Sequence, residues 1–283
     1  MPREAGSHAV ARHAIDSGTV LACVQSPQYR ARIVDALRNC ADVRFVETLW
    51  ELRALLRRTV TDVGTIIVSG HDANGTPAAA VVREIAAARP STAIIAYCQP
   101  GPPHNADLRA LALAGVHQFL IAGVDDVGLA LRAVLASARR HCAAEWVMRD
   151  LAPVVPASLH RIVEAILARP DEVTSIAALA DALSVHRKTL FNRCERAGFV
   201  GPAELLAWCR LALVAYYLDS TGCTIESIAL EMGFASDTAL RNAIKRYTGA
   251  TATAARATGA VRMVIAALER RTRPERRAAL HLV

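Results

Sequence analysis

The sequence predicts an α/β domain followed by an all-α domain. Short apolar runs rich in β-branched residues alternate with amphipathic segments along the first half of the chain. The pattern changes near residues 152–156, and only helical periodicity continues beyond that point. The chain has 283 residues, 53% of them hydrophobic, which is enough for two domains of ordinary size, each with its own core.

The first half contains five successive pairs of a strand and a helix. The expected strands are 19–24, 43–46, 65–68, 93–97 and 116–120. The expected helices are 30–39, 49–56, 77–88, 106–114 and 125–140, the last capped by Asp125 or Asp126. Because right-handed crossovers place such strands in parallel with helices on both faces, we expect a five-stranded, doubly wound sheet of flavodoxin-like order.

Prolines and charge divide the rest of the chain. Pro153 and Pro156 interrupt the helical pattern, so we place the domain boundary nearby. We expect an N-terminal tail over 1–18, the α/β domain over 19–140, a linker over 141–157, a helical domain over 158–257 and a basic tail over 258–283. The chain has a net charge of +7, and residues from 151 onward carry 17 basic and 12 acidic side chains. This local excess of positive charge favours a polyanionic partner.

The seven cysteines indicate a reducing compartment. They are Cys23, Cys40, Cys98, Cys142, Cys194, Cys209 and Cys223. Their odd number, wide spacing and lack of a C-x-x-C pair argue against a disulfide framework and a zinc site. Charged and His residues are spread through 1–18, and no run approaches the roughly 18 apolar residues of a membrane span. We therefore expect buried free thiols, no signal peptide, no membrane contact and a cytoplasmic protein.

The sequence carries no sign of an enzyme. No nucleophile elbow, phosphate-binding glycine loop or metal-ligand cluster stands out. We therefore expect no catalytic residues, no metal and no cofactor.

The helical half contains an approximate internal repeat. Residues 176–185 and 225–234 are similar, and Ala180 and Ala229 lie 49 residues apart in them. Each segment has apolar residues at helical spacing, a small residue where a second helix must cross closely, a turn, and an apolar residue after the turn. Gly233 in the second turn suits a left-handed backbone, and Ser184 takes its place in the first. This pattern predicts two helix-turn-helix units.

The second helix of each unit has a polar, cationic outer face. The candidate DNA-binding residues are Arg187, Lys188, Thr189, Asn192, Arg193 and Arg196, then Ser236, Thr238, Arg241, Asn242, Lys245 and Arg246. Arg and Asn can make two-point contacts with guanine and adenine edges, whereas Lys, Thr and Ser mainly contact phosphates. Residues early in such a helix usually enter the groove. Base contacts are therefore assigned to Arg187, Lys188, Thr189, Thr238, Arg241 and Asn242, and phosphate contacts to Arg196, Lys245 and Arg246.

The segment 202–219 is expected to form a helix that separates the two units. If it holds them about one DNA turn apart, both recognition helices can enter successive major grooves. Two alternatives stay open. The cationic faces are ordinary solvated surface, or the helical half belongs to a phosphorelay or docking protein and binds a protein partner.

The stretch from about Ser158 to Arg256 resembles the DNA-binding domain of the AraC/XylS family. The strongest match is "IESIALEMGFASDTALRNAIKRYTG", with "IAALADALSVHRKTLFNRCERAG" close behind. The resemblance implies a transcription regulator whose partners are double-stranded DNA, a second copy of the chain and RNA polymerase.

The first half resembles the receiver domain of response regulators. Such domains phosphorylate an Asp after the third strand, and they use carboxylates after the first, a hydroxyl after the fourth and a Lys after the fifth. The matching positions here hold Gln25, Ser26, Ser69, Cys98 and Ala122. Asp72 lies three residues too late. Because Mg²⁺ requires hard anionic oxygens that these side chains lack, we expect a degenerate receiver that serves dimerisation or signal input. Its crevice is expected either to bind a ligand or to consist of plain solvent-exposed loops.

Two further segments leave alternatives open. The helix that begins near residue 125 either pairs with a second copy or packs within one chain. The pairing residues would be Leu129, Val134, Leu135 and Trp146. The arginine-rich segment 261–283 either contacts phosphates or forms a solvated helix.

Overall fold

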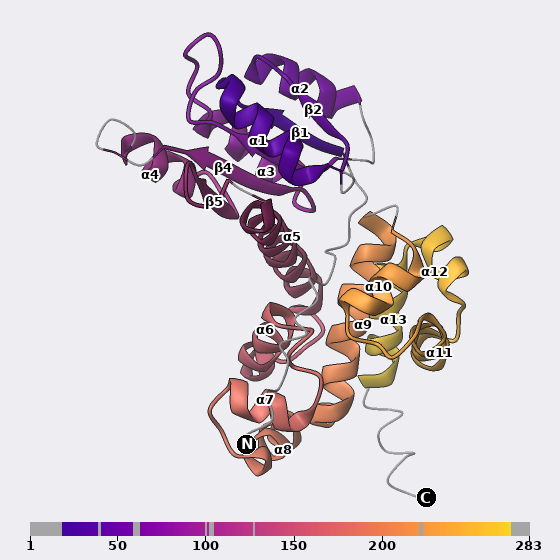
Figure 1. Cartoon of the computed structure of the whole chain (residues 1–283). Coiled ribbons are helices and arrows are strands. Elements are labelled where there is room, and N and C mark those ends of the chain that lie inside the picture. The colour runs from indigo at the N-terminus through magenta and orange to yellow at the C-terminus, as the bar shows by residue number, and fades with distance from the viewer. Residues whose placement is uncertain are drawn as a thin grey trace, which may run out of the picture.

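The α/β half of the protein is a single parallel sheet covered by helices on both faces. The computed structural model describes residues 19–38, 41–58, 63–99, 101, 105–126, 128–220 and 223–272. The strands are β1 (Thr19–Cys23), β2 (Val43–Phe45), β3 (Val63–Val68), β4 (Ala93–Cys98) and β5 (Gln118–Ile121). Their order across the sheet is β2-β1-β3-β4-β5, and all pairs are parallel (Figure 1). This is the flavodoxin-like order, so the predicted fold is confirmed.

Alternation along the strands builds two separate cores. The helices of this half are α1 (Pro27–Leu37), α2 (Leu49–Arg58), α3 (Ala79–Ala88), α4 (Asn105–Leu113) and α5 (Gly128–Leu151). Successive strand residues point to opposite faces. Val20 and Ala22 therefore pack with α1 and α5, whereas Leu21 and Cys23 pack with α2, α3 and α4.

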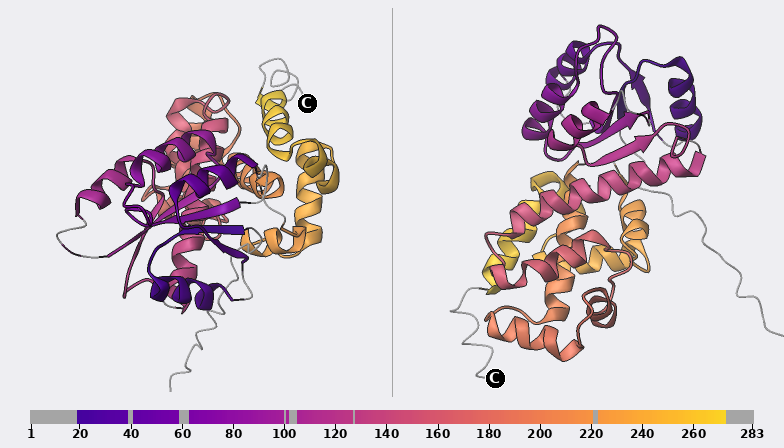
Figure 2. Two further views of the ribbon diagram at one scale, coloured as in Figure 1. Left: turned by 90° about the horizontal axis from the view of Figure 1, so that it is seen from above. Right: turned by 90° about the vertical axis from the view of Figure 1, so that its left-hand side faces the viewer.

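Helix α5 is shared by the two halves of the molecule. Its first part, including Leu131 and Leu135, belongs to the core beneath the sheet. Its last part, including Val147 and Leu151, belongs to the core of the helical half (Figure 2). The interval 141–157, expected to be a linker, therefore begins with packed helix. Cys142 belongs to the core beneath the sheet and Ala143 to the helical core, so the change from one core to the other falls within 141–157. The exact division into domains remains a prediction.

The expectation that Asp125 or Asp126 caps this helix stays a prediction, because residue 127 lies outside the described residues. The described part of α5 begins at Gly128, and both carboxylates bond to backbone before it. Asp125 accepts from the N–H of Ile121 at 2.9 Å, and Asp126 accepts from the N–H of Gly123 at 2.9 Å. Both residues stabilise the turn that leads from β5 to α5.

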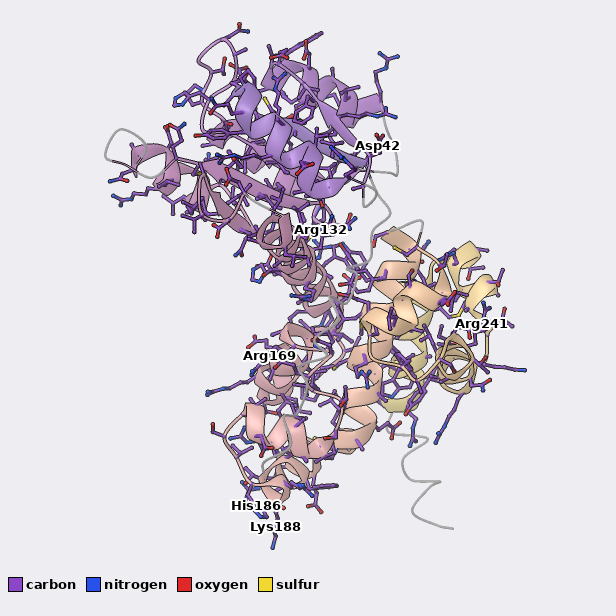
Figure 3. All side chains as sticks on the ribbon, in the orientation of Figure 1. Asp42, Arg132, Arg169, His186, Lys188 and Arg241 are labelled. Atoms are coloured by element: carbon purple, nitrogen blue, oxygen red, sulfur yellow. The ribbon has the colours of Figure 1, made fainter. Side chains whose placement is uncertain are left out.

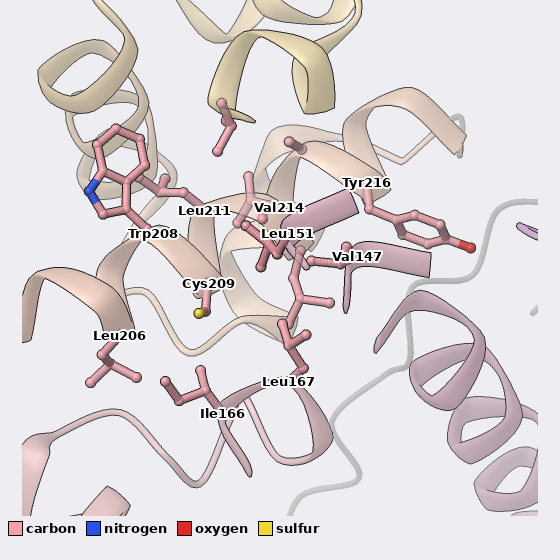
Figure 4. Close-up of a cluster of buried hydrophobic side chains, with 14 of the residues drawn as sticks. Val147, Leu151, Ile166, Leu167, Leu206, Trp208, Cys209, Leu211, Val214 and Tyr216 are labelled. Atoms are coloured by element: carbon pink, nitrogen blue, oxygen red, sulfur yellow. The ribbon is translucent and has the colours of Figure 1, made fainter. Parts of the chain in front are cut away.

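The helical half is built around one long buried helix, α9. Its helices are α6 (His160–Ala168), α7 (Ile176–Ala182), α8 (Arg187–Arg196), α9 (Pro202–Ser220), α10 (Ile225–Glu231), α11 (Asp237–Thr248), α12 (Ala252–Thr258) and α13 (Ala260–Thr272), preceded by the 3-10 turn η2 (Ala157–Leu159). Side chains of α9 such as Leu206 and Cys209 pack against α5 and α6 (Figure 4). The predicted all-α architecture is confirmed.

The segment after residue 258, expected to be a basic tail, starts with a packed helix. Val261, Val264 and Leu268 of α13 are buried in the helical core. The carboxylate of Asp219 accepts hydrogen bonds from the N–H groups of Ala260 at 2.7 Å and Val261 at 2.9 Å, so it caps α13. Residues 273–283, with the last three arginines, lie outside the described residues.

The end of α9 also contacts the α/β half. The Tyr216 hydroxyl donates to the backbone carbonyl of Ser91 at 2.8 Å, and its ring lies 5.5 Å from that of Trp146. Leu135 is buried and Val134 is half-buried within the same chain. Packing within one chain therefore accounts for three of the four residues proposed to pair α5 with a second copy. Leu129, at 68% exposure, is the exception.

The described cysteines are buried free thiols, as expected. Burial raises the pKa of Cys142 to about 11, which makes it a poor nucleophile at neutral pH. Cys40 lies outside the described residues. Within the described ranges, no helix is long and apolar enough to cross a membrane.

Candidate nucleic-acid interface

Two helix-turn-helix units lie on either side of α9 in the sequence. The first is formed by α7 and α8, and the second by α10 and α11. Leu190 and Cys194 of α8 are buried, as are Leu240 and Ile244 of α11. The apolar face of each second helix therefore points into the core, and its polar face points outward.

The turns of the two units share one backbone conformation. Ser184 has a φ of 52° and Gly233 a φ of 66°, both in the left-handed region. The N–H of Val185 then donates to the carbonyl of Ala180 at 2.9 Å, and that of Phe234 to Ala229 at 2.8 Å. These bonds satisfy carbonyls at the ends of α7 and α10, so the turns predicted at Ser184 and Gly233 are confirmed.

Substitutions in the two turns are expected to change stability in opposite directions. Ser184→Gly relieves a left-handed conformation that disfavours a side chain, so it should raise the free energy of unfolding by about 0.5–1 kcal/mol. Gly233→Ala should lower the free energy of unfolding by about 1 kcal/mol, because alanine disfavours the left-handed backbone at this position. The added Cβ itself would meet no clash, since its nearest neighbour, an Arg210 atom, is 3.8 Å away. Urea denaturation followed by circular dichroism measures both changes. The same sign for both variants would contradict this account.

Side-chain caps fix where each of these four helices begins. Ser175 and Thr224 accept from the N–H groups of Ala178 and Ser227, each at 3.1 Å. Ser236 accepts from Ala239 at 3.1 Å and begins α11. His186 Nδ1 accepts from the N–H of Lys188 at 3.2 Å and begins α8. In this cap the Ser236 oxygen acts as an acceptor, so its hydroxyl proton is not used by the cap.

The predicted DNA-binding side chains lie on the outer faces of α8 and α11, except Ser236, which caps the start of α11. Thr189 and Asn192 are half-buried, and the other ten candidates are exposed. Figure 3 shows Lys188 at one extremity of the helical half and Arg241 on its outer surface. For Arg187, Lys188, Arg193 and Arg196, no ion pair lies within the described part of the chain. The first unit therefore presents cations that are not neutralised within this part of the chain.

The second unit differs because Arg241 has a carboxylate partner on its own helix. Its Nε donates to Asp237 Oδ2 at 3.3 Å, one turn earlier in α11. The same hydrogen bond is the main reason that the pKa of Asp237 lies below its ordinary value. Among the described residues, no hydrogen bond engages the terminal nitrogens of Arg241, and a guanidinium can make a two-point contact with guanine. The sequence analysis does not predict the role of Asp237 as a partner of Arg241.

Arg210 of α9 contacts the turn between α10 and α11, a role that sequence patterning did not predict. Its guanidinium donates to the carbonyl of Met232 and lies 5.0 Å from the ring centre of Phe234. Burial lowers the pKa of Arg210 from its ordinary value. Both contacts fix the turn between α10 and α11, so Arg210 positions the second recognition helix from the core side.

The crevice at the carboxyl edge of the sheet contains most of the degenerate receiver positions. Gln25, Ser26, Ser69 and Cys98 line one cavity of about 270 Å³, and Ala122 is not part of its lining. The cavity also includes His71, whose Nδ1 lies 3.3 Å from Asp107 Oδ2. In the predicted alignment, the amide of Gln25 and the hydroxyls of Ser26 and Ser69 therefore hold the positions of carboxylates, and the thiol of Cys98 holds that of a hydroxyl. Within the described residues, no group of His, Cys, Asp and Glu side chains could hold a metal ion.

Asp72 lines this cavity, but the backbone already occupies its carboxylate. It accepts from the N–H of Leu49 at 3.0 Å and from those of Asn74 and Thr76 at 2.9 Å. Burial acts to raise the pKa of Asp72, and these hydrogen bonds outweigh it and hold the pKa below its ordinary value. Asp72 therefore stabilises the loop after β3.

Comparison with known proteins supports the assignment of the helical half. Residues 179–258 match the model of a family described as a helix-turn-helix domain. The chain is also 34% identical over 112 residues to a Streptomyces lividans protein named an AraC-like transcription regulator. That alignment covers 38% of this chain and 34% of the relative, so the match spans about a third of the relative's length. The predicted helix-turn-helix domain is confirmed, and its resemblance to the AraC/XylS family is supported.

Solved structures similar to this chain include a signal receiver domain and full-length FixJ. One is the signal receiver domain of an HD domain-containing protein from Pseudomonas fluorescens, 19% identical, with a TM-score of 0.40. The similarity covers 46% of this chain and 93% of that domain. Another is full-length FixJ from B. japonicum, 16% identical with a TM-score of 0.38, covering 68% of this chain and 96% of that protein.

Proposed function

We propose that this protein is a sequence-specific DNA-binding transcription regulator. Its two recognition helices, α8 and α11, enter successive major grooves of one duplex, and it performs no catalysis. The observation that supports this best is the presence of two units with the same turn, each presenting an exposed cationic helix face.

The length of α9 fits this arrangement. Its 19 residues extend about 28 Å at 1.5 Å per residue, which approaches the roughly 34 Å of one DNA turn. Because α9 is buried along most of its length, it is a stiff spacer between the units. One chain would thus supply the two readers that a dimer of single units supplies.

Selection of binding sites from a random duplex library tests the proposal. We expect a preferred site with two blocks of sequence about 10 base pairs apart. In mobility-shift assays, binding should weaken steeply as salt rises, because Lys and Arg displace counterions condensed on DNA. Failure to enrich any site would contradict the proposal. It would favour the alternative of a helical half that binds a protein.

The α/β half is proposed to be a pseudo-receiver that mediates dimerisation or signal input. Leu113, Val124 and Leu129 are 73%, 65% and 68% exposed, and a partner would cover such apolar groups. Sedimentation velocity of the full chain measures the state of association. A monomer at the concentrations that saturate the selected site would contradict the dimer.

Acetyl phosphate with Mg²⁺ is expected to leave the protein unmodified. The position after β3 that would accept a phosphoryl group holds Ser69, and the carboxylate of Asp72 is fully engaged by backbone donors. Intact-protein mass spectrometry would detect a phosphoryl adduct of about 80 Da. An acid-labile adduct that disappears in an Asp72→Asn variant would show that the crevice is an active receiver site.

A further inference from the structure

Phe191 is an apolar side chain exposed on the first recognition helix. It is 53% exposed, although the chain has only five phenylalanines and its helical half has a well-filled core. Among the described residues of the helical half, the other large hydrophobic side chain with comparable exposure is Leu230 on α10, at 57%. Leu230 lies outside both recognition helices, so only Phe191 is placed where DNA is expected.

The helical repeat places Phe191 beside the proposed base-contacting residues. Leu190 and Cys194 are buried, so they fix which side of α8 faces the core. Phe191 follows Arg187 by four positions and Lys188 by three, and all three are exposed. Residues at these spacings have Cβ atoms roughly 5–6 Å apart on one helix face. If Arg187 and Lys188 enter a major groove, the Phe191 ring enters it with them.

The chemistry of the major groove limits what a phenyl ring can contact there. Base edges present hydrogen-bond donors and acceptors, and the only apolar group among the four bases is the C5-methyl of thymine. Phe191 neither donates nor accepts hydrogen bonds. A phenyl ring set against the purine edges would desolvate polar groups without replacing their bonds with water, and cytosine offers a bare C5–H in place of a methyl group.

We propose that Phe191 makes the first unit select thymine, by packing its ring against the C5-methyl group. This inference rests on the proposed function, since it requires α8 to lie in a major groove. It assigns Phe191 as a specificity-determining residue and gives the two units different preferences. The first adds an apolar contact to the base contact proposed for Arg187, whereas the second relies on the guanidinium of Arg241.

Replacing thymine with deoxyuridine tests the contact, because it removes the methyl group and leaves every hydrogen bond in place. Each thymine of the selected site is replaced in turn, and the Kd is measured for the wild-type chain, Phe191→Ala and Phe191→Leu. We expect one position at which wild type loses about fourfold in affinity, the equivalent of one buried methyl group. Phe191→Ala should show no such loss there, and Phe191→Leu a reduced one.

Leu230→Ala is the matched control, since it also removes an exposed apolar side chain from the helical half. It should retain the wild-type response to deoxyuridine. The ratio of affinities for thymine and deoxyuridine sites is read within each variant, so a general loss of stability does not produce the expected pattern. The inference would be overturned if wild type bound the thymine and deoxyuridine sites equally well at every position. It would also be overturned if Phe191→Ala lost as much affinity on deoxyuridine substitution as wild type does. Failure to select any site would instead contradict the proposed function.

Discussion

Replacement of Asp126 by alanine is expected to lower the free energy of unfolding of the α/β half by about 3–4 kcal/mol. The Asp126 side chain is fully buried and accepts hydrogen bonds from the Tyr97 hydroxyl, Arg32 and the N–H of Gly123. Hydrogen bonds to a charged acceptor contribute about 1.5–3 kcal/mol each, and Tyr97 and Gly123 would be left unpaired. Arg32 is 42% exposed, so water can replace its partner and it adds little to the loss.

Urea denaturation followed by circular dichroism measures this loss. Asp35→Ala is the matched control, because Asp35 forms an ion pair with Arg38 at 3.1 Å in which both side chains are mostly exposed. That substitution should change stability by less than about 1 kcal/mol. A loss from Asp126→Ala no larger than that of the control would show that the buried carboxylate is dispensable.

The contribution of Asp126 should also depend on pH with a defined sign. Burial acts to raise its pKa, but the hydrogen bonds from Tyr97 and Arg32 outweigh burial, so its pKa lies below the ordinary value. A carboxyl group with a lowered pKa stabilises the fold above the ordinary pKa of about 4. That stabilisation is lost as the pH falls through the lowered pKa. The difference in stability between wild type and Asp126→Asn should therefore shrink in acid.

The α/β fold was predictable because its signals are local. Each buried strand is a short apolar run between turn residues, and each helix follows at a short distance, so the crossover rule leaves few arrangements. The roles of Asp126 and Asp219 were not predictable in the same way. Asp126 pairs with Arg32, 94 residues away in the sequence, and Asp219 caps a helix 41 residues later. No local pattern indicates such partners.

At the candidate interface too, features with a local sequence signal were predictable and those that depend on distant contacts were not. Helical periodicity alone separates Leu190 and Cys194, which are buried, from the polar side chains of α8, so the outer faces were identified correctly. The same periodicity also places Phe191 outward, and it was missed because only polar side chains were considered as DNA contacts. The pairing of Asp237 with Arg241 was available from their spacing of four residues. The contacts of Arg210 with the second turn join distant parts of the sequence, so only the folded structure reveals them.

Combined replacement of Arg187 and Arg241 by alanine is expected to abolish most sequence-specific binding. A side chain that makes a two-point contact with a base contributes about 1–3 kcal/mol, or about 5- to 150-fold in Kd. The two arginines belong to different units and no contact joins them within the described residues, so their effects should add. The double variant should therefore lose about the product of the two single losses. Fluorescence anisotropy on the selected site measures all three values.

Arg169→Ala is the matched control, because Arg169 is an exposed arginine of the helical half that lies outside both recognition helices. It should bind the selected site as wild type does. If the Arg187 or Arg241 variants lose as much on random DNA as on the selected site, those side chains contact phosphates and other residues read the bases. If only one of the two single variants loses affinity, the unit that carries the other arginine does not read bases at that site. The proposed pair of readers would then be reduced to one.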